Sequence, residues 1–149
     1  AEEIWSYLPH SDSDNSESIF LNQMPEKSGI TFRDEFVKKW ELIYSTRETV
    51  NKALEEKRNE KVIGKSLEAN IIIHSGGEMF EKYSQLSDQL AEILIVSGVS
   101  VINDKDGETE FEVVRATGEK CERCWVYSET VGKDSEHPTL CSRCASVVK

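Results

Sequence analysis

Two closely spaced cysteine pairs near the C-terminus constrain the fold of this chain more than any other feature. Cys121 and Cys124 form one Cys-x-x-Cys pair, Cys141 and Cys144 form the other, and sixteen residues separate the two pairs. This spacing is typical of a zinc ribbon, because each tight turn brings two thiolates to the same ion. Tetrahedral Zn²⁺ with four sulfur ligands has no open coordination position. We therefore predict one structural zinc ion per chain, held by these four cysteines, and no hydrolysis at the metal.

Other uses of the cysteines fit the sequence less well. A rubredoxin-like iron centre usually has glycine after the second cysteine of each pair, whereas Trp125 and Ala145 occupy these positions. A redox-active dithiol would not explain why two matching pairs are present. The chain has no sign of secretion, so metal binding is favoured over disulfides and a cytosolic compartment is expected. His137 is a possible substitute ligand, but four cysteines already complete the shell.

The residues beside the cysteines indicate what the zinc module could contact. Trp125 follows the first pair directly and lies two residues after Arg123. An aromatic ring beside a cation can stack on unpaired RNA bases, for about 1–3 kcal/mol per base. The alternative is that Trp125 packs beneath the ribbon as a small core, and the residue chemistry leaves both interpretations open. Lys120, Arg123 and Arg143 can offset the charge of about −2 that four thiolates leave on zinc.

Length and composition limit the class of protein. The chain has 149 residues, 38% of them hydrophobic and 31% charged. A modest core is possible, but a large catalytic barrel or doubly wound sheet is not. No apolar stretch approaches the roughly 18 residues of a membrane span, and the opening AEEIWSYL is not a signal peptide.

The distribution of charge bears on nucleic-acid binding, against which the net charge of −10 argues at first. Segments 1–32 and 66–114 have net charges of −5 and −8, whereas segments 33–65 and 115–149 have net charges of +2 and +1. A phosphate backbone could therefore contact the two basic segments and avoid the acidic ones. The same asymmetry is also consistent with ordinary solvated surface.

The N-terminal part of the chain is predicted to be helical. Residues 1–8 have the pattern of the end of an amphipathic helix, which Pro9 stops, and no N-cap precedes them. We therefore expect the chain to be a piece of a longer protein, with 10–31 as a polar surface connection. The clearest helix spans 32 to about 58, where Arg47 fills one gap in an apolar stripe. The apolar members of this stripe are Phe36, Trp40, Ile43, Val50 and Leu54.

Segment 63–114 alternates between strand and helix patterns, which together with the long helix and the ribbon predicts an α+β fold. We expect the last two strands to pair as a hairpin around Asp106-Gly107. Ser75-Gly76-Gly77 lacks the lysine and the spacing of a phosphate-binding loop. The predicted elements are a turn at 63–64, a helix over 78–91, and strands over 67–73, 93–96, 99–102 and 111–114.

No catalytic constellation is present in the sequence. The histidines His10, His74 and His137 are scattered, and no serine lies in a nucleophile elbow. The carboxylates lie in charged helix faces and loops. If the chain belongs to an enzyme, we expect the active site on another segment, and no catalytic residue is assigned.

Several stretches of the sequence resemble the C-terminal part of bacterial isoleucyl-tRNA synthetases. The opening AEEIW resembles a helix near the end of the anticodon-binding domain in class I synthetases for isoleucine, valine and leucine. RETVNKALEEKR at 47–58 and IGKSLEA at 63–69 resemble the helix and turn that follow it. GEKCERCW at 118–125 and HPTLCSRC at 137–144 are similar to the terminal zinc module, which valyl and leucyl relatives generally lack.

The resemblance implies a function for the whole enzyme and a position within that enzyme for this segment. Such an enzyme attaches isoleucine to its tRNA using ATP and Mg²⁺, and its Rossmann core, with the HIGH and KMSKS signatures, and its editing domain would lie upstream. The segment would contact the anticodon arm of isoleucine tRNA. Its expected partners are that tRNA and the upstream domains of a cytoplasmic, monomeric enzyme, with no membrane. The implied domains are an anticodon-binding-domain tail (1–65), a small α/β junction unit (66–115) and a zinc ribbon (116–149).

The resemblance also carries roles over to individual residues. The four cysteines become zinc ligands, and Arg123 and Trp125 become tRNA contacts. Weaker candidates for RNA contact are the basic residues Arg47, Lys57 and Arg58 of the long helix and its exit. Arg47 could instead form a buried structural ion pair, because it lies within the apolar stripe.

Two other functions compete with this one. A free-standing zinc-ribbon module that binds DNA or RNA would use the same cysteines, and the ribbon also resembles the terminal zinc finger of formamidopyrimidine-DNA glycosylases. Those enzymes use an N-terminal Pro-Glu as the nucleophile, which Ala1-Glu2 cannot replace. A structural or protein-interaction element, whose zinc holds a surface for another domain, would have no measurable RNA affinity at about 100 mM salt.

Overall fold

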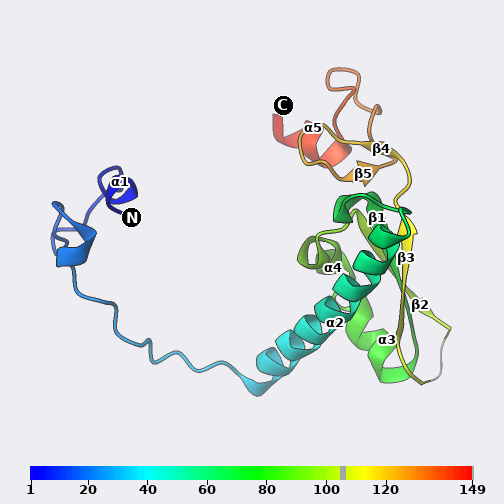
Figure 1. Cartoon of the computed structure of the whole chain (residues 1–149), viewed down its shortest axis with the longest axis horizontal. Helices are drawn as coiled ribbons and strands as arrows, with labels where there is room; N and C mark the ends of the chain where they lie inside the picture. Colours follow the sequence, from blue (N-terminus) through cyan, green and yellow to red (C-terminus); the bar gives the residue numbers. More distant parts are fainter. Residues whose placement is uncertain (105–106, 149) are drawn as a thin grey trace. The chain divides into compact units, whose positions relative to one another are not determined.

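A computed structural model describes residues 1–104 and 107–148 of the chain. The chain divides into two compact units, Ala1–Asp34 and Glu35–Lys149. Figure 1 shows the second unit as a long helix beside a three-stranded sheet, followed by the C-terminal zinc module. The predicted α+β fold class is confirmed. Within the described part of the chain, no helix is both long and apolar enough to cross a lipid bilayer.

The N-terminal unit contains two short helices, α1 (Glu2–Trp5) and the 3₁₀ helix η1 (Ile19–Leu21). The helix predicted over 1–8 is thus shorter than expected. The Ser18 hydroxyl joins the two elements, because it donates to the Glu2 carboxylate at 2.7 Å and accepts from the Phe20 N–H at 3.1 Å. Ile4 and Leu8 of the predicted apolar face are exposed, whereas Trp5 is half-buried and its ring lies against that of His10, with the centroids 4.5 Å apart.

Helix α2 (Asp34–Asn59) confirms the predicted long helix and supplies one wall of the core. Ile43, Val50 and Leu54 are buried, but Arg47 is exposed and Thr46 takes the fourth place in the stripe. The Thr46 hydroxyl lies 2.8 Å from the Tyr83 hydroxyl, inside the core. A small hydroxyl side chain can be buried with one partner, whereas a guanidinium would need several. The alternative of a buried ion pair at Arg47 is therefore wrong.

The sheet has the strand order β2-β1-β3, with β1 (Ala69–Ser75) in the middle. The strand β2 (Gly98–Asn103) runs parallel to β1, and β3 (Glu110–Arg115) runs antiparallel to it. The predicted hairpin between 99–102 and 111–114 is therefore wrong, because both strands pair with β1 instead of with each other. Residues 105 and 106 of the predicted turn lie outside the described residues. The apolar run of β1 explains this order, since a central strand is the most deeply buried.

Two helices connect β1 to β2. They are α3 (Gly77–Ser84) and α4 (Ser87–Leu94), where the sequence predicted one helix over 78–91 and a strand over 93–96. The prediction of a strand over 93–96 is therefore wrong. Leu94 continues the buried face of α4, and Ile95 ends the helix in a left-handed conformation with φ of 58°. A short apolar run does not distinguish a strand from the last turn of a buried helix.

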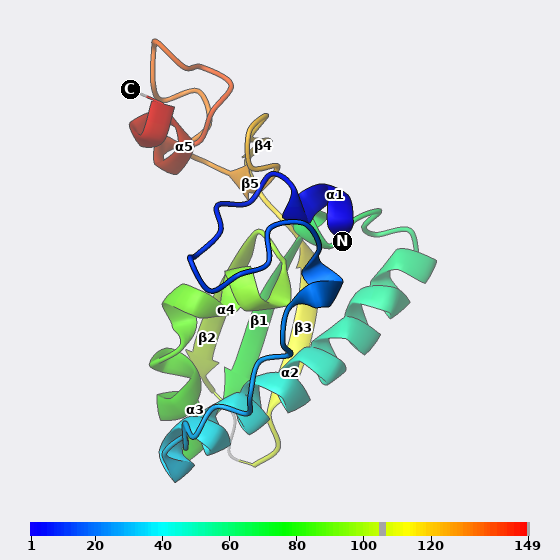
Figure 2. The ribbon, with the colours of Figure 1, turned by 90° about the vertical axis from the view of Figure 1, so that its left-hand side faces the viewer.

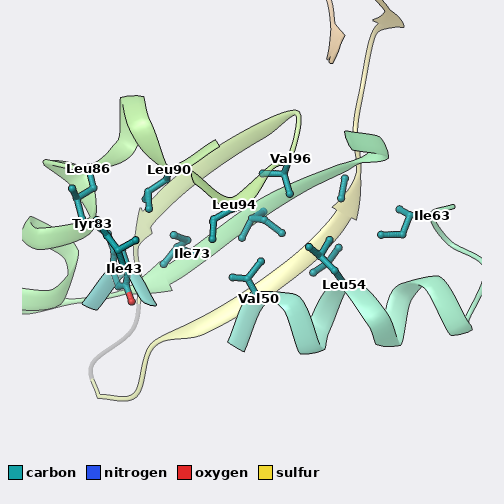
Figure 3. Close-up of a cluster of buried hydrophobic side chains, with 13 residues drawn as sticks. Ile43, Val50, Leu54, Ile63, Ile73, Tyr83, Leu86, Leu90, Leu94 and Val96 are labelled. Carbon is teal, nitrogen blue, oxygen red and sulfur yellow. The ribbon is translucent and has the colours of Figure 1, made fainter. Parts of the chain in front are cut away.

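The core lies between the sheet and the helices α2, α3 and α4 (Figure 3). Side chains from α2 and α4 converge on β1. Every second residue of this strand is buried, namely Ala69, Ile71, Ile73 and Ser75. Because α2 shares this core with the sheet, residues 43–54 and 69–113 stabilise one another. The zinc module follows β3 and contains β4 (Glu119–Lys120), β5 (Tyr127–Ser128) and α5 (Ser142–Val148), with β4 and β5 paired antiparallel (Figure 2).

Candidate metal centre and nucleic-acid interface

Two different local structures bring the cysteine pairs together. Residues 121–124 form a tight turn, in which the Trp125 N–H donates to the Cys121 carbonyl at 2.8 Å. Cys141 precedes α5, and Cys144 lies in the first turn of that helix. The Glu122 N–H donates to the Thr139 carbonyl at 3.2 Å and holds the two halves against each other. The predicted pairing of two knuckles is thus confirmed as one turn and one helix start.

The four sulfur atoms form a single cluster. All of them lie within 4.8 Å of one another, and Cys124 Sγ is 3.8 Å from Cys141 Sγ. A tetrahedral zinc ion with bonds of about 2.3 Å places its sulfurs about 3.8 Å apart. The donor set and its spacing therefore fit one zinc ion with four cysteine ligands. His137 is not part of this cluster and lies in a turn where the Asp134 carboxylate accepts its N–H at 3.1 Å.

The protein environment lowers the pKa of two of these thiols, Cys121 and Cys144, and raises that of a third, Cys141. Burial opposes ionisation of Cys121, but the backbone N–H groups of Cys124, Cys141 and Arg123 together lower its pKa to about 6. Arg123 lowers the pKa of Cys144, because its guanidinium lies 3.7 Å from that sulfur. Burial raises the pKa of Cys141 to about 11. Without metal, Cys141 therefore keeps its proton to higher pH than Cys121 or Cys144, and zinc would displace that proton.

Two arginines offset the negative charge of the thiolates. Arg123 reaches Cys144, as described above, and Arg143 lies beside Cys124, whose sulfur raises the pKa of the guanidinium. Arg143 also donates to the Glu92 carboxylate on α4 at 3.0 Å. A four-thiolate zinc site has a net charge of about −2, so two nearby cations stabilise it.

Trp125 is exposed and does not form the core of the module. The residue is 60% exposed, whereas Val131 and Leu140 pack against the cysteines in that place. The interpretation that Trp125 packs beneath the ribbon is therefore wrong. Its backbone has φ of 67°, a left-handed conformation that costs a residue with a side chain about 1–2 kcal/mol. The module thus holds a large exposed ring at a position where glycine would be less strained.

Lys120 is a partner of Trp125 that the sequence did not indicate. Its ammonium group lies over the indole, with Nζ 5.6 Å from the ring centroid. The two residues lie at opposite ends of the first cysteine pair, and the turn between them folds one over the other. Only the position of Lys120 directly before Cys121 could have suggested this contact. The cation that accompanies the ring is therefore Lys120, while Arg123 is directed at the metal ligands.

Comparisons with known proteins agree with this geometry. Residues 118–147 match a family described as a zinc finger found in FPG and IleRS. All of the chain aligns with isoleucine–tRNA ligases: 44% identical to that of Bacillus mycoides (strain KBAB4), 43% to that of Bacillus cereus (strain B4264) and 42% to that of Bacillus cereus (strain AH820). Over its whole length the chain is therefore similar to isoleucine–tRNA ligases. It spans 17% of the length of these relatives and corresponds to the C-terminal part of the ligases.

The three basic residues of α2 that were proposed from the sequence as RNA contacts lie in different surroundings. Lys57 is paired with Glu60 at 2.8 Å, and that hydrogen bond raises its pKa. Arg58 is paired with Glu55 and also donates to the Gly64 carbonyl at 3.3 Å. Arg47 is exposed and lines a shallow hollow of about 400 Å³ together with Tyr44 and Asn51. None of the three lies in the zinc module, so they do not form one site with Trp125.

Proposed function

We propose that this chain is the tRNA-binding C-terminal part of an isoleucine–tRNA ligase and that its zinc module contacts the anticodon arm. The catalytic steps, which use ATP and Mg²⁺ to attach isoleucine to tRNA, would take place on other parts of the longer enzyme. The proposal assigns 1–65 to the end of the anticodon-binding domain, 66–115 to the junction unit and 116–149 to the zinc ribbon. The names of the relatives and the exposed ring of Trp125 support it.

The exposure of Trp125 is the observation that carries the proposal. A strained, exposed tryptophan adds little to the stability of its own module, because little of its apolar surface is buried. A flat aromatic surface on a rigid turn suits an unstacked base, which stacks on such rings with little sequence preference. Zinc keeps this turn rigid, since both ends of 121–124 are ligands. The metal would therefore hold a stacking surface for RNA and take no part in chemistry.

Lys120 would add a cation at the edge of the same surface. Its ammonium group lies against the Trp125 ring and remains on the exposed side of the ribbon. A phosphate group next to a stacked base would lie within reach of such a cation. Arg123 would contribute to RNA binding indirectly. Its guanidinium lies beside Cys144 and offsets the negative charge of the thiolates that hold the metal. Of the three basic residues of α2 proposed from the sequence, Arg47 is exposed and suits a further backbone contact, whereas Lys57 and Arg58 are half-buried and paired with glutamates.

Charge favours contact through the zinc module over contact through the sheet. Segment 115–149 has six basic and five acidic residues, whereas segment 66–114 has two basic and ten acidic residues. Glu110 and Glu112 lie exposed on β3, so the phosphate backbone would be repelled there. The module is thus the end of the second unit that RNA would approach.

The test separates the two steps of the full ligase. Residues equivalent to 121–149 would be deleted from the full-length enzyme, and ATP–pyrophosphate exchange with isoleucine and charging of tRNA would be assayed independently. The proposal predicts that exchange persists while charging collapses. If both reactions survive, the RNA role of the module is wrong. If both are lost, the module holds the fold together, and a separate measurement of tRNA affinity in a folded variant would decide its role.

A further inference from the structure

Three successive carbonyl groups, where the 3₁₀ helix η2 (Ser66–Glu68) meets β1, accept hydrogen bonds from two other segments. The Leu67 carbonyl accepts from the Ser97 hydroxyl, and the Ala69 carbonyl accepts from the Ser97 N–H at 2.9 Å. Between them, the Glu68 carbonyl accepts from the Ala116 N–H at 2.7 Å. Ser97 precedes β2, and Ala116 follows β3 on the connection to the zinc module. This end of the sheet is therefore the place where the module is attached.

The hydroxyl of Ser97 continues from the sheet into the zinc module. Its oxygen accepts the Tyr127 N–H of β5 at 2.8 Å while the same group donates to Leu67. Tyr127 is the register partner of Lys120 in the β4–β5 pair. Lys120 in turn lies over the ring of Trp125. A continuous series of contacts thus leads from the first strand of the sheet to the exposed ring.

The remaining described links between sheet and module are weaker or are part of the connection itself. The Arg143–Glu92 ion pair joins α5 to α4, but its side chains are 61% and 77% exposed. Exposed ion pairs are screened by salt and contribute little. Ala116 lies on the covalent connection, so its hydrogen bond does not fix how the ribbon turns beyond it. The bonds of Ser97 are partly buried and act directly on β5.

We propose that Ser97 is a positioning residue that fixes the Lys120–Trp125 pair relative to the sheet. A ring held in one orientation loses less freedom when RNA binds, so the anchored module binds more tightly than a freely turning one. The inference rests on the proposed function, because it assumes that Trp125 is the RNA contact. It adds a residue of the junction unit, outside the zinc module, to the determinants of tRNA affinity.

A double-mutant cycle tests this coupling. The zinc-loaded 149-residue chain would be prepared as wild type, Ser97→Ala, Trp125→Ala and the double variant, and its affinity for a transcript of isoleucine tRNA would be measured. The exchange rate of the Tyr127 amide would be followed by NMR in the same samples. Ser97→Thr keeps a hydroxyl, and Ser100→Ala removes an exposed serine of β2 as the matched control.

We expect Ser97→Ala to retain one zinc per chain, to speed Tyr127 exchange about 10-fold and to weaken tRNA binding about 3- to 10-fold. In the Trp125→Ala background it should cause no further loss, because the ring that it positions is gone. Ser97→Thr should restore both properties, and Ser100→Ala should change neither.

Three results would overturn the inference, and they are distinguishable. Unchanged Tyr127 exchange in Ser97→Ala would contradict the anchoring of β5. If the fold-losses of tRNA affinity in the two single variants multiply in the double variant, Ser97 acts independently of Trp125. If Trp125→Ala alone leaves the affinity unchanged, the proposed RNA contact is wrong, and the positioning role for RNA is wrong with it.

Discussion

Gly118 lies so close to Ser128 that no side chain could replace its hydrogen. A Cβ atom on Gly118 would be 2.4 Å from the Ser128 carbonyl carbon and 2.5 Å from the Glu129 nitrogen. The backbone there has φ of 84°, a conformation that glycine adopts without strain. This approach lets the chain leave the sheet and begin the β4–β5 ribbon directly across from its partner strand. The ribbon that presents Trp125 therefore depends on this glycine.

We predict that Gly118→Ala disrupts the zinc module. The contacted atoms are backbone, which cannot move aside without breaking the β4–β5 pair, so a loss of several kcal/mol is expected. Gly132→Ala is the matched control, because φ there is 83° but the nearest atom to a Cβ would be 3.7 Å away. It should cost only the strain of about 1–2 kcal/mol. Zinc affinity by competition with a chelator would distinguish them, and equal effects would contradict the steric account.

Removal of zinc should unfold the module and leave the rest of the second unit folded. The cysteine cluster with Val131 and Leu140 is separate from the core formed by α2, the sheet and α4. Zinc binding supplies about 10–16 kcal/mol in small modules of this kind, which this cluster could not replace by burial. On chelation, amide NMR signals of 118–147 should collapse while those of α2 and β1 persist. Loss of signals throughout 35–104 would contradict the separation of the two cores.

The stability of the sheet should depend on the protonation of His74. Its Nδ1 lies 2.9 Å from the Asp104 carboxylate and its Nε2 lies 3.4 Å from that of Glu112, and these bonds raise its pKa above 6.5. Because the pKa is raised in the folded state, the protonated His74 stabilises the folded protein. This contribution to the unfolding free energy is fully present below the pKa of the unfolded state and is lost as pH rises through the pKa of the folded state.

The difference in unfolding free energy between wild type and His74→Gln should therefore shrink as pH rises from about 5.5 to about 8. Urea denaturation at several pH values would measure it. Asp104→Asn should reduce this dependence on pH more than Glu112→Gln does, since Asp104 is the larger cause of the raised pKa. A difference that stays constant or grows with pH would contradict the assignment.

The metal site and the main elements were predictable because their signals are local. The spacing of the cysteines defines the ligand set, and the 3.6-residue period defines α2. The order of strands was not predictable in the same way. The turn sequence at 104–107 favours a hairpin, but the apolar face of β1 takes both neighbours, and such long-range pairing has no local signature.

Contacts of individual residues were also not predictable where they depend on residues far away in the sequence. Thr46 rather than Arg47 fills the stripe of α2, because its partner Tyr83 comes from α3, 37 residues away. The contact of Lys120 with Trp125 depends on how the knuckle folds, and the position of Lys120 directly before Cys121 is its one local sign. The exposure of Trp125, on which the proposed function depends, likewise could not be predicted without the positions of Val131 and Leu140.

A comparison of stability and RNA affinity between Trp125→Gly and wild type tests the proposed role of this ring. Glycine relieves a backbone strain of about 1–2 kcal/mol, which offsets the greater freedom of an unfolded glycine, about 0.4–1 kcal/mol. Zinc content and unfolding free energy should therefore stay within about 1 kcal/mol of wild type, while affinity for isoleucine tRNA falls on the order of 10-fold or more. Trp125→Phe, which keeps a ring, should retain most of the affinity. A Trp125→Gly variant that binds zinc and tRNA as wild type does would contradict the claim that zinc holds this ring for RNA.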